Sequence, residues 1–503
     1  MILALILLFP LVAAALSAIP RLRRIASGVT VVSSVGILLL ASYVALAVAH
    51  GASRIGFRGV LAVDGLSALI VWLVAIVCTT AAVYSAGYMH RTARDHPARL
   101  RLYYTSYNLF IFAMLAIPMV LEPTLVWIFV ELTTLTSALL VSFENTQAAL
   151  EAAWKYMALS LIGAAIALLG FLVLFAALQA AGGHEPYSWA GLINAAPRMP
   201  PALLKAAFVL IVVGLGTKVG LVPLHTWLPD AHSQAPSPVC ALLSGIETTS
   251  VLYVILRLLP ILDAAALAAL RDWMVTFGLI SVGAAAFLLL QVRDYKRLFA
   301  FSTVEHMGII LVASGLASQA AHYGAMYQIL SHTVTKSFCF FAAGAAVISV
   351  TTRDIGSVRG LIRSVPAAGA SLLLGGLAIA GAPPLAVFLS EFLILKAGLA
   401  EGRYIVVALL TLFIAIAFFG VLFHINRMVF GRASEALTTK PTLPDPPAHG
   451  PLEQGASPLS SLALPTSCTV ILVLSGALVV MLGIYLPAPV HQLLRLASDA
   501  LHR

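Results

Sequence analysis

Apolar stretches of about 20 residues, each closed by a short polar or basic segment, repeat along the whole chain. A helix of that length crosses the hydrocarbon core of a bilayer, so each stretch predicts one transmembrane helix. The pattern therefore predicts an all-α polytopic membrane protein. We expect about 14 spans, at roughly 1–19, 27–50, 63–88, 103–121, 124–142, 152–180, 202–224, 236–260, 269–291, 299–317, 320–350, 366–398, 404–430 and 467–488.

The polar segments divide these spans into groups. Residues 433–466 form the longest polar stretch, and their proline and serine content predicts a linker. We therefore expect the last helix, within 467–503, to be an appendage to the bundle. The remaining helices fall into an N-terminal group of three in 1–102 and two five-helix units in 103–260 and 261–432.

The two five-helix units are predicted to be inverted repeats, helices 4–8 and helices 9–13. The seventh and twelfth spans are both interrupted by proline, and each carries one ionisable residue near the break, Lys218 and Glu391. An even-numbered and an odd-numbered span cross the membrane in opposite directions, which is the signature of an inverted repeat. Broken helices are tolerated in a membrane only where the freed backbone is buried or lines a wet cavity.

Composition and charge distribution support a membrane protein. Hydrophobic residues make up 61% of the 503 residues and charged residues 10%, against roughly 25% charged residues in soluble domains. The net charge of +9 does not indicate nucleic acid, because with the N-terminus outside, 16 basic residues fall in cytoplasmic loops and nine on the other side. We expect a multi-pass inner-membrane protein with its N-terminus outside.

Motifs for cofactors are missing from the sequence. The four cysteines are isolated, and neither GxGxxG nor GxxxxGK[ST] occurs. His225, Asp230 and His232 have conceivable metal spacing, but their ligand set falls short of a usual site, so we interpret them as a polar cap after the broken helix. We expect no metal, no cofactor and no catalytic residue.

The candidate chemistry lies in ionisable residues within apolar spans, where a charge costs about 2.5–3.5 kcal/mol and usually serves ion movement. Lys218 is the natural partner of a carboxylate such as Glu131, and a shift of that carboxylate would switch the lysine between holding and releasing a proton. The alternatives are a protonated Glu131 bonded through Thr133 or Thr134, and a permanent structural ion pair at Lys218.

Further candidates follow along the chain. His332 and Lys336 lie four residues apart, on one face of a helix, and favour a proton relay over a satisfied core histidine. Glu247 is either a relay carboxylate between the repeats or a group capped by Thr248 and Ser250. The secondary candidates are Glu305, His306, His225, Lys155, for which an interfacial role is equally open, and Lys396, for which snorkelling to the interface is favoured.

Several segments resemble a known family. WLPDAHSQAPSPV at 227–239, DYKRLFAFSTVEHMG at 294–308, SHTVTKSF at 331–338 and PPLAVFLSEFLILK at 383–396 are similar to the antiporter-like subunits of respiratory complex I, the Mrp cation/proton antiporters and the membrane-bound hydrogenases. LEAAWKYMALSLIGAAIALLG at 150–170 and ALLSG at 241–245 look closest to component F of hydrogenase-4.

The resemblance implies a proton-translocating subunit of a redox complex of hydrogenase-4, formate hydrogenlyase or complex I type, itself non-catalytic. In that family, residues matching Glu131, Lys218, His332, Lys336 and Glu391 form a hydrated polar axis. The helix-8 base of complex I subunits falls here near Thr249 or Ser244, which leaves Glu247. Other membrane subunits are the implied partners, and protons the implied ion, with Na⁺ an additional candidate. The alternative is a Mrp-like antiporter or an inorganic-carbon uptake subunit working without redox partners.

Overall fold

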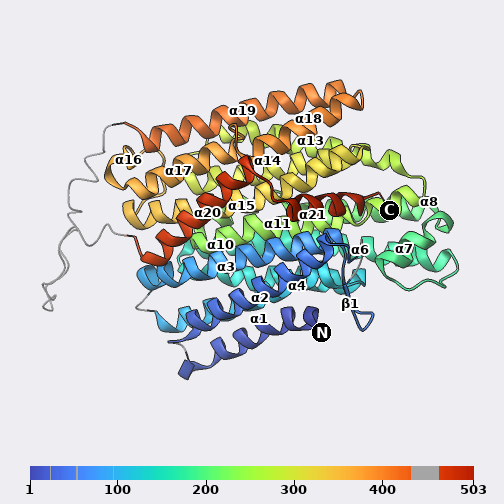
Figure 1. Ribbon diagram of the computed structural model, residues 1–503, viewed down its shortest axis with the longest axis horizontal. Helices are drawn as coiled ribbons and strands as arrows, with labels where there is room; N and C mark the ends of the chain where they lie inside the picture. Colours follow the sequence, from blue (N-terminus) through green and yellow to red (C-terminus); the bar gives the residue numbers. More distant parts are fainter. Residues whose placement is uncertain (23, 53–54, 94–95, 432–463, 503) are drawn as a thin grey trace, which may run out of the picture.

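The computed structural model describes residues 1–22, 24–52, 55–93, 96–431 and 464–502. Its helices lie side by side along the long axis of the molecule, with α1 at one edge of the bundle and α19 at the opposite edge (Figure 1). The N- and C-termini lie at the same end, together with β1, α7 and α21 (Figure 1). The predicted linker at 433–466 lies almost wholly outside the described residues.

The N-terminal group contains a hairpin besides its helices. The elements up to residue 119 are α1 (Ile2–Ala18), η1 (Pro20–Leu22), α2 (Ala26–Ala49), β1 (Ile55–Phe57), β2 (Leu61–Val63), α3 (Gly65–Ala93) and α4 (Pro97–Met119). The strands pair antiparallel, with Ile55 opposite Val63. Hydropathy alone did not predict this hairpin, because its strands have three residues each.

The middle of the chain is helical. Its elements are α5 (Pro123–Val141), η2 (Ser142–Glu144), α6 (Gln147–Ala180), α7 (Trp189–Ala195), η3 (Ala196–Arg198), α8 (Pro201–Val219), α9 (Trp227–Gln234), α10 (Ser237–Leu242), the π-helical turn η4 (Leu243–Glu247), α11 (Thr248–Leu256), α12 (Leu259–Ala264) and η5 (Ala268–Leu270).

The last part is helical as well. Its elements are α13 (Arg271–Leu289), α14 (Tyr295–Gly315), α15 (Gln319–Val350), α16 (Leu361–Ser364), α17 (Pro366–Ile379), α18 (Ala386–Ala400), α19 (Tyr404–Val429), α20 (Thr466–Ile484) and α21 (Ala488–Asp499).

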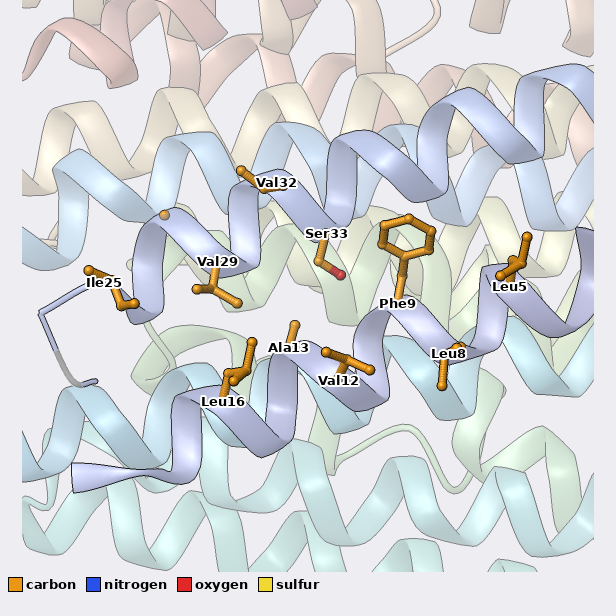
Figure 2. A pocket seen from close by; sticks show the side chains of 11 residues that line it. Leu5, Leu8, Phe9, Val12, Ala13, Leu16, Ile25, Val29, Val32 and Ser33 are labelled. Atoms are coloured by element: carbon orange, nitrogen blue, oxygen red, sulfur yellow. The ribbon is translucent and has the colours of Figure 1, made fainter. Parts of the chain in front are cut away.

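The prediction of an all-α polytopic membrane protein is confirmed in its class. Among the described residues, 12 helical segments are long and apolar enough to cross a membrane. The shorter apolar helices α1 and α17 lie within two further predicted spans. At the edge of the bundle, α1 and α2 enclose a groove of about 610 Å³ whose lining is almost entirely apolar, with Phe9 and Val32 among its side chains (Figure 2). Such a wall suits a lipid-facing surface.

Two spans are broken, as their prolines predict. Helix α8 ends where Gly220 takes a φ of +88°, and α17 ends just before Gly381 with a φ of +77°. Glycine adopts this left-handed conformation without steric cost. The Trp227 indole nitrogen donates to the Thr217 carbonyl over 2.8 Å, so one carbonyl freed by the first break is satisfied.

The last helix is part of the bundle, so the expectation of an appendage is wrong. The Tyr327 hydroxyl of α15 donates to the Leu482 carbonyl of α20 over 2.8 Å. Gly65 of α3 lies so near the backbone of Leu496 in α21 that a Cβ on it would be 2.7 Å away. An apolar helix gains no hydrophobic energy from packing in lipid, so close approach and hydrogen bonds hold it in place.

Candidate functional site

The eighth predicted span lies at the centre of the bundle and carries the first functional group. The apolar stretch within Ser237–Ala264 is wholly buried. At η4, the Thr248 N–H bonds to the Leu243 carbonyl, five residues back, which defines a π-helical turn. This turn brings Glu247 into the core with no exposed surface.

Lys218 forms an ion pair with Glu247 and not with Glu131. The Lys218 Nζ lies 3.2 Å from Glu247 Oε1, and both side chains are buried. The predicted pairing with Glu131 is therefore wrong for this structure, because the π-helical turn brings a nearer carboxylate to the lysine. Glu131 is half-buried, close enough for its charge to act on Lys218, and its Oε1 has no hydrogen-bond partner among the described residues.

Polar side chains on the neighbouring helices surround this ion pair. Tyr156 donates to Glu247 Oε1 over 2.8 Å, and Thr133 donates to the same oxygen over 3.2 Å. Lys218 donates to the Val130 carbonyl over 2.9 Å and to the Thr134 hydroxyl. A buried pair is stable only when such additional hydrogen bonds satisfy both charges. Thr248 and Ser250 do not cap Glu247, because Thr248 donates instead to the Ser244 carbonyl.

Tyr156 belongs to this candidate site, and the sequence did not indicate it. The sequence left an interfacial role open for its neighbour Lys155, and the Lys155 side chain is 48% exposed, whereas Tyr156 is fully buried. Successive residues on a helix point about 100° apart, so one faces the ion pair and the other faces outward. The available signal was the recurrence of hydroxyl groups in the preceding span, where Thr133 and Ser137 both bond to this cluster.

A second cluster lies on α14 and α15. The Lys336 Nζ donates to the Phe299 carbonyl over 2.6 Å and to the Ser302 hydroxyl. Glu305 is buried near enough for its charge to act on Lys336. The four-residue spacing of His332 and Lys336 predicted a shared helix face, and both side chains are fully buried.

The π-helical turn joins the two clusters. His332 Nε2 lies 3.1 Å from the Ser244 carbonyl, so this nitrogen carries the hydrogen, while Nδ1 has no partner among the described residues. The Ser244 hydroxyl also lies 2.7 Å from the Thr303 hydroxyl of α14. The Ser244 carbonyl therefore accepts from two side chains, His332 of α15 and Thr248 of its own span. Ser244 thus lies between the two clusters, at one of the two positions to which the resemblance assigned the helix-8 base of complex I subunits.

Buried polar residues run from Glu131 and the Lys218–Glu247 pair to His332, and we call this series the polar line. Beyond His332, it continues towards the second break. The rings of His332 and His306 are 5.2 Å apart between centroids. His306 Nε2 bonds to the Ile379 carbonyl over 3.1 Å, and its Nδ1 lies 3.2 Å from the Gln328 amide nitrogen. Gln328 also accepts a hydrogen bond from the Ser390 hydroxyl. Both nitrogens of His306 are therefore satisfied.

Glu391 ends this line next to the second break. It is buried, and its Oε2 would be 2.6 Å from a Cβ on Gly381, so any larger residue there would force the carboxylate to shift. Lys218 precedes the glycine of its break, whereas Glu391 follows the corresponding one. The two ionisable groups hence lie on opposite sides of their breaks.

The secondary candidates at the bundle surface do not join the line. Lys155 pairs with Glu151 at 2.7 Å and with Asp230 at 3.4 Å. Lys396 is exposed, as the snorkelling interpretation requires. Asp230 binds Arg297 at 2.6 Å, and His225 is half-buried in the loop after the first break. Within the described ranges, no three His, Cys, Asp or Glu residues are grouped so that they could hold a metal ion.

Comparisons with known proteins show the family of this chain. A family model described as "NADH:quinone oxidoreductase/Mrp antiporter, TM" matches residues 122–417, and one described as "NADH-Ubiquinone oxidoreductase (complex I), chain 5 N-terminus" matches residues 54–99. A Hydrogenase-4 component F homolog from Methylacidiphilum infernorum is 39% identical over 346 residues, which cover 68% of this chain and 73% of that protein.

Two solved structures share the fold. A chain of the membrane-bound sulfane sulfur reductase, an archaeal respiratory membrane complex, matches with a TM-score of 0.85 and 22% identity over 99% of this chain and 97% of that one. A chain of the Mrp complex from Dietzia sp. matches with a TM-score of 0.83 and 19% identity, over 99% and 96% of the two chains.

Fold and site together define an antiporter-like subunit, a polytopic membrane protein with ionisable groups along its buried centre. This chain belongs to the family of proton-translocating subunits that occurs in hydrogenase-4, complex I and Mrp antiporters. The resemblance drawn from the sequence is confirmed, including its hydrogenase-4 branch.

Proposed function

We propose that this chain carries protons through the membrane along the line from Glu131 to Glu391, as a subunit of a larger membrane-bound redox assembly of the hydrogenase-4 type. The observation that carries the proposal is the buried Lys218–Glu247 pair, with a second carboxylate, Glu131, within electrostatic reach of the lysine. Intramembrane ionisable groups of this kind mark proton relays.

The lysine is the switching element. It lies in the last turn of α8, where the partial negative charge of a helix C-terminus favours a cation. Two carboxylates compete for this one cation, and Glu131 Oε1 has no other partner among the described residues. Movement of Lys218 between Glu247 and Glu131 leaves one carboxylate unpaired in turn, and an unpaired buried carboxylate takes up a proton.

Protons pass between this pair and the second cluster by way of η4. His332 bonds to the Ser244 carbonyl in that turn, and Lys336, Glu305 and His306 follow on α14 and α15. In this proposal the first five-helix unit contributes the Lys218–Glu247 pair and the second contributes the histidines and Glu391. Partner subunits supply the redox chemistry, and the N-terminus faces outside.

The test is Lys218→Ala in membrane vesicles that contain the whole assembly. We expect proton pumping to be abolished while the variant still assembles in the membrane. Lys155→Ala is the matched control, because that lysine is half-exposed at the bundle surface and should leave pumping unchanged. Normal pumping by the Lys218→Ala vesicles would refute the proposed line.

A Mrp-like exchanger is the second candidate function, favoured by the Mrp complex chain that shares the fold. The two candidates differ in their driving force. Acidification that requires an electron donor supports the redox assembly. Proton movement driven by an imposed Na⁺ gradient alone, in vesicles without a donor, would favour the exchanger.

A further inference from the structure

Polar residues follow one face of the eighth span from the centre of the bundle towards the end that carries both termini. Glu247, Ser250, Tyr253 and Arg257 are spaced by three, three and four residues. Residues at this spacing lie one above another on a helix. Apart from Thr248 and Thr249 in the first turn, the remaining positions of α11 are apolar, so this face is a polar stripe along a fully buried helix.

The inner end of this stripe has unused hydrogen-bonding capacity. Among the described residues, Glu247 Oε2 and the Ser250 hydroxyl have no partner, and both residues are fully buried. Glu247 Oε1 already faces three donors, so Oε2 is the oxygen that is available for a proton. Buried polar atoms one helical turn apart are the setting in which a bridging water is found.

The outer end of the stripe is a connected network. The Tyr253 hydroxyl lies 3.0 Å from the Ser67 hydroxyl, accepts from Arg257 Nε over 2.9 Å and donates to the Pro118 carbonyl over 3.2 Å. Arg257 binds both oxygens of Asp64 at 2.6 Å and also donates to Ser67 over 2.6 Å. Neither the ion pair at Lys218 nor the histidine cluster uses any of these groups.

This network ends at a cavity that reaches the surface. The cavity has a volume of about 220 Å³ and is lined by Asp64 and Arg257, by the exposed Gly51, and by Leu496 of α21. Trp189 also lines it, and the Trp189 indole nitrogen is buried without a partner among the described residues. Charged groups and an unused donor make this cavity suitable for water.

We propose that this stripe is the outer exit of the proton path, from Glu247 Oε2 through Ser250, Tyr253 and Ser67 to the water-filled cavity at Asp64 and Arg257. Each hydroxyl accepts one proton and donates another, and the Tyr253 hydroxyl does so by rotating between the Pro118 carbonyl and the Ser67 hydroxyl. This row of hydroxyls therefore conducts without any net change in its groups. Arg257 positions Asp64 and places a fixed positive charge at the exit, which keeps a proton from resting there. The inference rests on the proposed function and adds a direction to it.

The experiment measures proton pumping by Ser250→Ala and Tyr253→Phe in vesicles that contain the whole assembly. Each change removes a single hydroxyl. Ser250 has no partner to lose among the described residues, so its variant should fold as the wild type does. We expect pumping to fall about tenfold or more in each variant. The reason is that a missing hydroxyl removes one hydrogen-bonding group from the path and so raises the free-energy barrier to proton transfer.

The controls are Ser314→Ala and Tyr327→Phe, two buried hydroxyls of the second unit that lie off the stripe and should leave pumping unchanged. If both stripe variants pump like the wild type while Lys218→Ala does not pump, the exit is overturned and the proposed function stands. Pumping by Lys218→Ala would overturn the exit and the proposed function together. If Tyr253→Phe does not assemble, Ser250→Ala alone decides the result by the same criterion.

Discussion

The ion pair at the centre of the bundle can be tested by a double-mutant cycle. The perturbations are Lys218→Met, Glu247→Met and the two together, which keep the side-chain volume while they remove one or both charges. Thr133 and Tyr156 keep other partners when the carboxylate is lost, since Thr133 also donates to the Val130 carbonyl and Tyr156 also bonds to Ser137. The cycle therefore isolates the two charges.

The expected magnitude follows from the separation of the charges. At 3.2 Å and an effective dielectric constant of about 20, the Coulomb attraction is about 5 kcal/mol. Removal of Lys218 leaves the Glu247 charge buried and unpaired, which costs about 3–5 kcal/mol of folding free energy. Removal of Glu247 leaves Lys218 with only the more distant charge of Glu131. Removal of both charges costs far less, because a well-packed apolar pair often equals a buried ion pair. We expect the double variant to be about 2 kcal/mol or more above either single variant in stability.

Two assays are needed for this cycle. Denaturation in detergent, followed by circular dichroism, gives the stabilities of the four proteins, and acidification of vesicles gives their pumping. We expect the double variant to regain stability and still not pump. Additive stabilities would show that the two groups do not form the pair seen in the structure. Pumping by the double variant would show that the pair is structural only.

Two further substitutions test single contacts of the site. Tyr156→Phe removes one donor to Glu247 and should lower pumping about tenfold, measured beside the assembly level in the same vesicles; unchanged pumping would remove Tyr156 from the site. Gly381→Ala should reduce both stability and pumping more than Gly402→Ala, measured by thermal denaturation and acidification. Both glycines have a left-handed φ, but only a Cβ on Gly381 meets Glu391. Equal effects of the two substitutions would contradict close packing of the Glu391 carboxylate against Gly381.

The sequence predicted most helices because a transmembrane span needs a long apolar run, and the two breaks because proline and glycine interrupt their spans. It could not assign the partner of Lys218. Most helices here are apolar on every side, so hydropathy does not say which face of α5 or α11 points inward. Both Glu131 and Glu247 were available, and the choice depends on a π-helical turn that no local residue pattern indicates.

The same limit applies to residues whose neighbours are charged. Lys155 stood out as an ionisable group in an apolar helix, yet it lies at the surface, while the adjacent Tyr156 contacts the ion pair. The histidines were easier to interpret, because His332 and Lys336 share a helix face at four-residue spacing, and the structure buries both. Spacing within one helix can be taken from a sequence, whereas contacts between helices cannot.

The π-helical turn at 243–247 also bears on how this chain is aligned with its relatives. A turn closed over five residues holds one residue more than an α-helical turn, so everything before it is shifted by one position against everything after it. An alignment without a gap would pair the wrong residues on one side of the turn. Aligned by structure, a relative with a regular helix here should therefore need a gap of one residue within 243–247.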